Sequence, residues 1–112
     1  MAGDGDPVLM LWNKHTYTVQ LKGGRAQFKT EALHGLLQQL TVVPQTPDTI
    51  WSLHMKDRDG DILYETIDHA GRLDEREGIP VGGERSEALT IVIDEATKNE
   101  RFDLLFKVRE IK

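Results

Sequence analysis

Hydrophobic and polar residues alternate in three stretches of the chain, and each stretch is interrupted by a short polar segment. Opposite residues of an antiparallel hairpin face the same side of the sheet, so the alternation on its two strands must match. Three predicted hairpins pass this test, and a shift of one residue would break their matches. The matched pairs are Trp12–Tyr17, Met10–Val19 and Val8–Leu21; Leu53–Thr66, Met55–Tyr64 and Asp57–Ile62; Leu89–Phe106, Ile91–Leu104 and Ile93–Phe102.

One segment has a different period. In "TEALHGLLQQL" four leucines follow the i, i+3, i+4, i+7 spacing of an amphipathic helix: Leu33, Leu36, Leu37 and Leu40. The prolines of "VVPQTPDT" follow directly and cannot continue a helix. The pattern therefore predicts a short helix near residues 30–40.

The order of these elements favours a mainly β protein. We expect an antiparallel β-sandwich, jelly-roll-like, of about six to eight strands with one short helix. An α+β sheet with the helix on one face is the alternative. Residues 1–7 form a predicted flexible N-terminal arm and residues 8–112 a single domain. Residues 68–87 are polar and glycine-rich, with a short strand expected at Ile79–Val81.

The charge balance narrows the class of partner. The chain carries 19 acidic and 14 basic side chains, and its formal net charge is −5. The charges are scattered without a basic stripe, which disfavours nucleic-acid binding. There is no cysteine, so a disulfide or thiolate metal site is excluded. The N-terminal stretch "MAGDGDPVLMLW" has neither the pattern of a signal peptide nor that of a membrane span. We expect a location in a virion, or otherwise in the cytoplasm.

The stretch "HMKDRDGDILYE" holds the strongest chemical signal. Asp57, Asp59 and Asp61 are spaced like the first three ligands of a calcium-binding loop. In such a loop the glycine is at the sixth position, whereas here Gly60 is at the fourth, counted from Asp57. An Asp-Gly dipeptide is typical of a two-residue type I′ hairpin turn, which here would be centred on Asp59 and Gly60. The sequence therefore favours a hairpin turn, with a weak calcium site as the alternative, and predicts no cofactor.

Nothing in the sequence predicts catalysis. None of the four histidines belongs to a metal-binding pair, and His54 faces Glu65 across the second predicted hairpin. The only serines, Ser52 and Ser86, lack a nucleophile motif. A small hydrolase that uses a pair of carboxylates is the least favoured hypothesis. We therefore expect a protein that is not an enzyme.

Two groups of apolar residues have alternative interpretations. Trp12, Tyr17, Trp51 and Tyr64 could form a sugar-binding platform, but their positions favour core packing. A second group points away from the predicted core, and it either is covered within the domain or meets another protein. This second group is Leu9, Leu11, Leu63, Ile67, Val92 and Leu105.

The C-terminal stretch "ALTIVIDEATKNERFDLLFKVREIK" resembles the closing hairpin of small all-β structural proteins of tailed bacteriophages. The matching residues are 93–97 and 102–108, and "GIPVGG" at residues 78–83 is also similar to that group. These proteins include capsid cement (decoration) proteins, head–tail connector components and tail accessory proteins. The resemblance implies a structural role in contact with copies of a larger lattice protein, without catalysis or cofactor.

The leading hypothesis from the sequence is a virion accessory protein such as a capsid cement protein that bridges lattice subunits. Its partner would be a major capsid or other virion lattice protein, and homo-oligomerisation is left open. The predicted partner-binding residues are Asp4, Asp6, Pro7, Leu9 and Leu11. The alternative is a small ligand-binding β-sandwich, for a carbohydrate or for calcium. Neither a membrane nor a nucleic acid is an expected partner.

Overall fold

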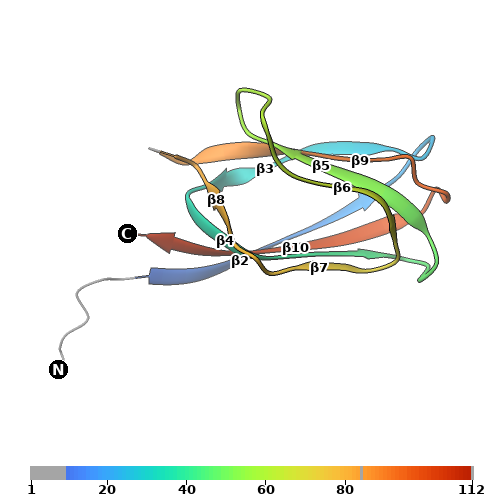
Figure 1. The fold of residues 1–112 in the computed structure, drawn as a ribbon, viewed down its shortest axis with the longest axis horizontal. Coiled ribbons are helices and arrows are strands. Elements are labelled where there is room, and N and C mark those ends of the chain that lie inside the picture. The colour runs from blue at the N-terminus through green and yellow to red at the C-terminus, as the bar shows by residue number, and fades with distance from the viewer. Residues whose placement is uncertain (1–9, 84, 112) are drawn as a thin grey trace.

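The computed structural model describes residues 10–83 and 85–111, together with the side chains of residues 13–83 and 85–110. All regular secondary structure in these residues is β-strand (Figure 1). The strands are β2 (Met10–Gln20), β3 (Ala26–Leu33), β4 (Gly35–Pro44), β5 (Ile50–Lys56), β6 (Ile62–Ala70), β7 (Leu73–Glu75), β8 (Ile79–Val81), β9 (Glu87–Asp94) and β10 (Arg101–Ile111). The predicted strand at Ile79–Val81 is confirmed as β8.

The strands form two antiparallel sheets, which lie one above the other as two layers (Figure 1). The first sheet has the order β2-β10-β4-β7, and β8 also pairs with β4. The second sheet has the order β3-β9-β5-β6. Because β7 and β8 lie along the same neighbour, they can be counted as one interrupted strand. On that count, one sheet contains the first, eighth, third and sixth of the described strands, and the other contains the second, seventh, fourth and fifth.

The core lies between the two sheets and takes alternate residues from each strand. Seven alternate residues of β10 and β9 are at most 2% exposed. These residues are Phe102, Leu104, Phe106 and Val108 from one sheet, and Leu89, Ile91 and Ile93 from the other. Each such side chain stabilises the fold by roughly 1.5–3 kcal/mol relative to an exposed one. The predicted mainly β architecture with two antiparallel layers is therefore confirmed.

The predicted helix at residues 30–40 is wrong, because this segment belongs to β3 and β4. Lys107 pairs with Gln39 and Val108 with Leu37, so Gln38 has no counterpart on β10. This β-bulge lets Leu37 and Leu40 face the core together although they are three residues apart. A bulged strand therefore reproduced the spacing of a helix, and the α+β alternative is wrong with it.

The chain passes from one sheet to the other at Gly35. Strand β3 ends at Leu33 in one sheet, and β4 begins at Gly35 in the other. Gly35 has a φ of +140°, and a Cβ atom at this position would lie 2.2 Å from the carbonyl oxygen of Arg109. Only glycine allows this backbone conformation and this close approach.

Two of the three predicted hairpins are wrong. Residues 10–20 form one continuous strand, β2, which pairs with β10. Strands β9 and β10 belong to different sheets, so their matched residues meet across the core and do not pair. Matching alternation cannot separate these cases, because facing the core imposes the same period on a hairpin and on two strands from opposite layers. The resemblance to tailed-bacteriophage proteins was based on this supposed closing hairpin.

The second predicted hairpin, formed by β5 and β6, is confirmed in most of its register. Met55 pairs with Tyr64, Leu53 with Thr66 and His54 with Glu65. The predicted pairing of Asp57 with Ile62 is wrong, since a bulge pairs Lys56 with Ile62. The predicted flexible arm, residues 1–7, lies outside the described residues.

Candidate functional site

The hairpin that joins β5 to β6 ends in a turn built by Asp57. The carbonyl oxygen of Asp57 accepts a hydrogen bond from the Gly60 amide at 3.1 Å. The amide of Asp57 donates a hydrogen bond to the Asp61 carbonyl at 2.9 Å. Gly60 has a φ of +86°, whereas Asp59 has no positive φ. The predicted two-residue type I′ turn needs a positive φ at both residues and is wrong. The turn is instead a three-residue loop that ends in a left-handed glycine.

Asp57, Asp59 and Asp61 each offer one carboxylate oxygen, and these oxygens lie within 4.8 Å of one another. The turn therefore brings together the three residues that the sequence singled out as a weak metal site. Asp57 Oδ1, however, already accepts hydrogen bonds from the Asp59 and Asp61 amides, both at 2.9 Å. These two bonds stabilise the turn, so the presence of Asp57 has a structural explanation that needs no ion.

A hollow of about 580 Å³ lies beside this turn, between it and the β8–β9 connection. Glu87 lines the hollow and binds the turn, because its Oε1 accepts a hydrogen bond of 2.8 Å from the Arg58 amide. The Arg58 side chain lies 3.7 Å from the same oxygen. Arg85 and Asp59 also line the hollow, so charges of both signs surround it. Its mixed lining shows no preference for one ligand class.

His54 lies on the outer side of the second sheet, between two carboxylates. Its Nδ1 lies 3.2 Å from Glu65 Oε1, and its Nε2 lies 3.4 Å from Asp94 Oδ1. The predicted cross-strand contact of His54 with Glu65 is thus confirmed. Because the two ring nitrogens point to different carboxylates, this arrangement links β6, β5 and β9. It does not converge on a single point where a metal ion could bind.

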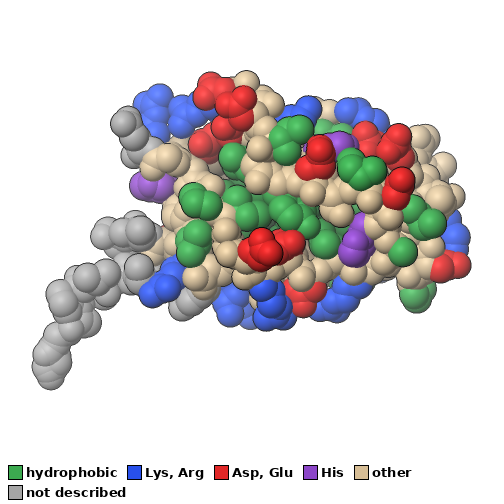
Figure 2. All heavy atoms as spheres, in the orientation of Figure 1, with side chains coloured by type: hydrophobic (Ala, Val, Ile, Leu, Met, Phe, Trp, Pro, Cys, Tyr) green, Lys and Arg blue, Asp and Glu red, His purple; other side chains and the backbone are tan. Residues whose placement is uncertain are grey.

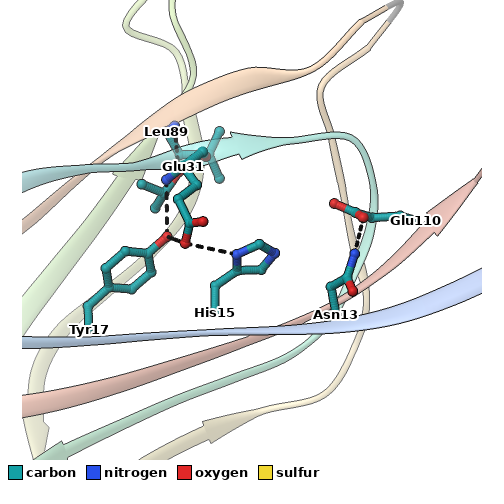
Figure 3. A network of polar contacts seen from close by, with 7 residues as sticks. Asn13, His15, Tyr17, Glu31, Leu89 and Glu110 are labelled. Carbon is teal, nitrogen blue, oxygen red and sulfur yellow. Dashed lines mark hydrogen bonds and ion pairs between the residues drawn. The ribbon is translucent and has the colours of Figure 1, made fainter.

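A second polar network closes the gap between the edge strands β2 and β3 (Figure 3). His15 Nδ1 lies 3.0 Å from Glu31 Oε1, and the Tyr17 hydroxyl donates to the same oxygen at 3.3 Å. The Tyr17 hydroxyl also accepts a hydrogen bond from the Glu31 amide at 3.0 Å. Hydrogen bonding to His15 and its charge lower the pKa of Glu31, while burial raises the pKa of Tyr17. The network therefore keeps Glu31 ionised where the two sheets meet.

The remaining histidines and Ser52 contact the backbone or stabilise turns. His34 Nε2 lies 3.0 Å from the Gly83 carbonyl, and His69 Nε2 lies 2.8 Å from the Arg72 carbonyl. The buried Ser52 hydroxyl accepts a hydrogen bond from the Asp68 amide at 3.0 Å. These contacts account for the side chains as structural groups.

Trp51 lies in the core and Tyr17 and Tyr64 pack against it, as the sequence favoured over a sugar-binding platform. Trp51 is completely buried, and its indole Nε1 donates to the Gly71 carbonyl at 2.8 Å. The Tyr64 hydroxyl donates to Glu75 Oε1 at 3.1 Å, which links the two sheets. Burial and this bond raise the pKa of Tyr64 to about 12. The side chain of Trp12 lies outside the described residues.

The outward-pointing apolar group divides into three parts. Val92 is 6% exposed and Leu63 is partly buried against the core, whereas Ile67 is 54% exposed. Leu105 is half-buried on the outer side of the first sheet. Among the predicted partner-binding residues, Asp4, Asp6, Pro7 and Leu9 lie outside the described residues. Leu11 lies in β2 opposite Glu110, and its side chain is likewise not described.

One anchoring residue was missed in the sequence. The Glu100 carboxylate accepts hydrogen bonds from the Thr46 amide (2.9 Å), the Thr46 hydroxyl (2.7 Å) and the Thr49 hydroxyl (2.9 Å). Partial burial raises its pKa, but these hydrogen bonds outweigh burial and lower the pKa below its ordinary value. Glu100 thereby ties the β9–β10 connection to the β4–β5 connection. No sequence motif marks this pairing, because the residues are about fifty positions apart.

Comparisons with known proteins define no family. No protein-family model and no curated protein matches the chain. One similar chain belongs to the structure of infectious bursal disease virus Gt strain, with a TM-score of 0.35 and 9% sequence identity. The match covers 93% of this chain and 34% of that one, so this chain spans about a third of that protein's length. The resemblance to tailed-bacteriophage proteins gains no support here. No helix in the described part of the chain is long and apolar enough to cross a membrane.

Proposed function

We propose that the chain is a non-catalytic structural module of a virion, of the capsid cement kind, that binds neighbouring protein subunits through its outer surfaces. Its strand order supports this role. With β7 and β8 counted as one strand, the two sheets have the strand order of a jelly roll. Jelly rolls build viral capsid domains, but they also build lectins and cupins, so the fold alone does not define the function.

The filled interior is the observation that carries the proposal. Trp51, Phe102 and Phe106 are completely buried between the sheets. Trp51 meets Phe102 edge-on, with 5.5 Å between the ring centroids. Large aromatic side chains thus occupy the space in which a jelly roll would hold an internal ligand. Binding is left to the outer surfaces, as a structural subunit requires.

The outer surface offers apolar contacts on one hairpin. Ile50 of β5 is 40% exposed, and Ile62 and Ile67 of β6 are 52% and 54% exposed. Strand β6 is also the last strand of its sheet, so one side of its backbone has no neighbouring strand among the described residues. Exposed apolar side chains on an edge strand are favourable sites for contact with another protein.

The proposal is tested by light scattering coupled to size-exclusion chromatography on the isolated protein. We expect assemblies larger than one chain whose mass is the same with calcium and with a chelator. Ile62→Ser should weaken the assembly, whereas Thr90→Ser, a mild change on the same sheet, should not. A protein that stays monomeric and whose melting temperature rises with calcium would contradict the proposal.

A second candidate is a calcium-binding module, and the clustering of the Asp57, Asp59 and Asp61 oxygens within 4.8 Å is the observation in its favour. It predicts a monomer whose melting temperature rises with calcium. The same measurement therefore separates the two candidates.

A further inference from the structure

Folding gathers basic side chains on one face of the molecule. Because Phe102, Leu104, Phe106 and Val108 of β10 point to the core, the alternate residues of this strand point outward from the first sheet. Their cross-strand neighbours extend the same outer surface, which we call the basic face. Arg72, which lines a hollow on this surface, and Arg76, which pairs with Asp74, also belong to it. Its cationic residues are Lys14, Arg72, Arg76, Arg101, Lys107 and Arg109.

The basic face has a charge opposite to that of the whole chain. In the described part of the chain its acidic side chains are Asp74 and Asp103, so six cations and two carboxylates give it a formal charge of +4. The chain as a whole carries −5. Figure 2 shows blue side chains along its lower margin, on the side of the layer that contains β2, β4 and β10. Cations that are scattered along the sequence therefore lie together on one surface of the folded protein.

Two of these cations are placed directly opposite each other. Lys14 of β2 pairs with Lys107 of β10 in the cross-strand register. Like charges in opposite positions destabilise a sheet. A local rule broken in this way is expected at a surface with a function.

The centre of the basic face is neutral and slightly hollowed. A depression of about 340 Å³ is lined by Thr16, Thr18, Thr41, Val43 and Leu105, with Arg72 at its side. A less polar centre surrounded by charged groups is typical of a protein–protein interface. A nucleic acid fits less well, because Asp103 borders the same hollow and the rest of the molecule is acidic.

The chain itself carries a matching surface at the tip of the β5–β6 hairpin. Asp59 and Asp61 are exposed there, and the next residue, Ile62, is 52% exposed. The tip therefore presents an apolar side chain beside two carboxylates. It projects from the layer opposite to the one that carries the basic face (Figure 1). The two surfaces cannot meet within one molecule, but they can meet between two.

We propose that the basic face binds the β5–β6 hairpin tip of a second copy of this chain. Ile62 of one copy enters the hollow beside Val43 and Leu105, while Asp59 and Asp61 meet the surrounding cations. The interface is head-to-tail, so each copy keeps one free face and one free tip, and repetition gives a ring or a filament. This inference rests on the proposed structural function and names its partner.

Two charge-reversal variants test the inference. Lys14→Glu/Lys107→Glu alters only the face, and Asp59→Lys/Asp61→Lys alters only the tip. Asp57 is left unchanged because its carboxylate holds the turn. The control Lys22→Glu/Lys29→Glu makes the same change in net charge as the face variant, on exposed lysines outside both surfaces. Circular dichroism melting curves establish that every variant is folded.

Analytical ultracentrifugation at low salt should show wild-type assemblies that weaken between about 0.05 M and 0.5 M salt, as exposed charges are screened. Each reversal variant alone should bind itself about tenfold or more weakly than wild type, and the control should not change. A mixture of the two variants should form a one-to-one complex, since one supplies an intact tip and the other an intact face. An interface that uses only one of the two surfaces would give no such complementation.

Three results would overturn the inference. The first is assembly that both reversal variants leave unchanged, which would leave the proposed structural function standing. The second is a wild-type monomer at all concentrations, and the proposed function would fail as well if calcium also raised the melting temperature of this monomer. The third is salt-dependent binding of a DNA duplex that the face variant loses, together with self-association that it retains. That result would identify the basic face as a nucleic-acid surface.

Discussion

Leu37 and Leu40 lie three residues apart on strand β4, and both face the core because Gln38 bulges between them. Deletion of Gln38 would remove the extra residue and place the two leucines two positions apart, so both would still face the core in a regular strand. We expect this deletion to lower the free energy of unfolding by about 1 kcal/mol at most. Deletion of Thr41 would instead make Leu40 and Val42 adjacent and turn one of them toward solvent, at a cost of about 2 kcal/mol or more. Urea unfolding curves would measure both variants, and a larger loss for the Gln38 deletion would contradict this account.

Gly35, at the sheet crossing, should tolerate substitution by alanine less well than Gly23. In Gly35→Ala the new Cβ would meet the Arg109 carbonyl oxygen at 2.2 Å, and the backbone would also be strained. Gly23→Ala serves as the matched control, because Gly23 has a φ of +60° but no atom near the new methyl group. We expect a loss of about 1 kcal/mol for Gly23→Ala and a clearly larger one for Gly35→Ala. Thermal melts of the two proteins would rank them, and the reverse order would show that the crossing can relax.

Glu100 should make part of the stability depend on pH. Its pKa is lower in the folded protein than its ordinary value of 4.5. A carboxyl group of this kind stabilises the fold fully above its unfolded pKa, and the contribution is lost as the pH falls through the folded pKa. Glu100→Gln should therefore be less stable at neutral pH, and its melting temperature should fall less steeply on acidification. Melting curves from pH 7 to pH 3 test this, and parallel curves for both proteins would contradict it.

Trp51 should depend on its indole nitrogen as well as on its volume. Trp51→Phe would leave the buried Gly71 carbonyl without its 2.8 Å hydrogen bond. Loss of this partner and a residual cavity should cost about 2–4 kcal/mol. Val92→Ala removes apolar volume from the outer side of a sheet and should cost less. Denaturant unfolding would compare the two, and the inference about Trp51 fails if Val92→Ala is the more damaging change.

Calcium should have no effect on the melting temperature under the proposed structural role. The turn is held by backbone hydrogen bonds to Asp57, which form without an ion. Differential scanning calorimetry with calcium and then with a chelator should give one value. A rise with calcium that Asp59→Asn/Asp61→Asn abolishes would instead support the ion-binding candidate.

The alternation of apolar residues was sufficient to predict the class of fold, because core-facing positions in any strand recur with a period of two. It also placed most of the β5–β6 register, since this hairpin has a short local turn. It could not assign strands to sheets: Ile91 and Leu104 match whether they pair or meet across the core. The apparent helix arose from a bulge, and no residue type in β4 predicts the position of this bulge.

The candidate site was predicted in part. The sequence identified Asp57, Asp59 and Asp61 as a group, and the turn does bring their oxygens together. It did not reveal the basic face, because Lys14 and Lys107 are opposite each other in the sheet but 93 positions apart in the chain. Only the pairing of the described first and last strands unites them.

Strand β10 lies in the interior of its sheet between β2 and β4, although it follows all the other described strands in the sequence. Because synthesis runs from the N-terminus, the other described strands emerge from the ribosome before β2 can pair with β10. Until then β2 exposes unpaired backbone and apolar side chains, which favour aggregation. Chains that are cut off before β10 should therefore yield aggregated or degraded product.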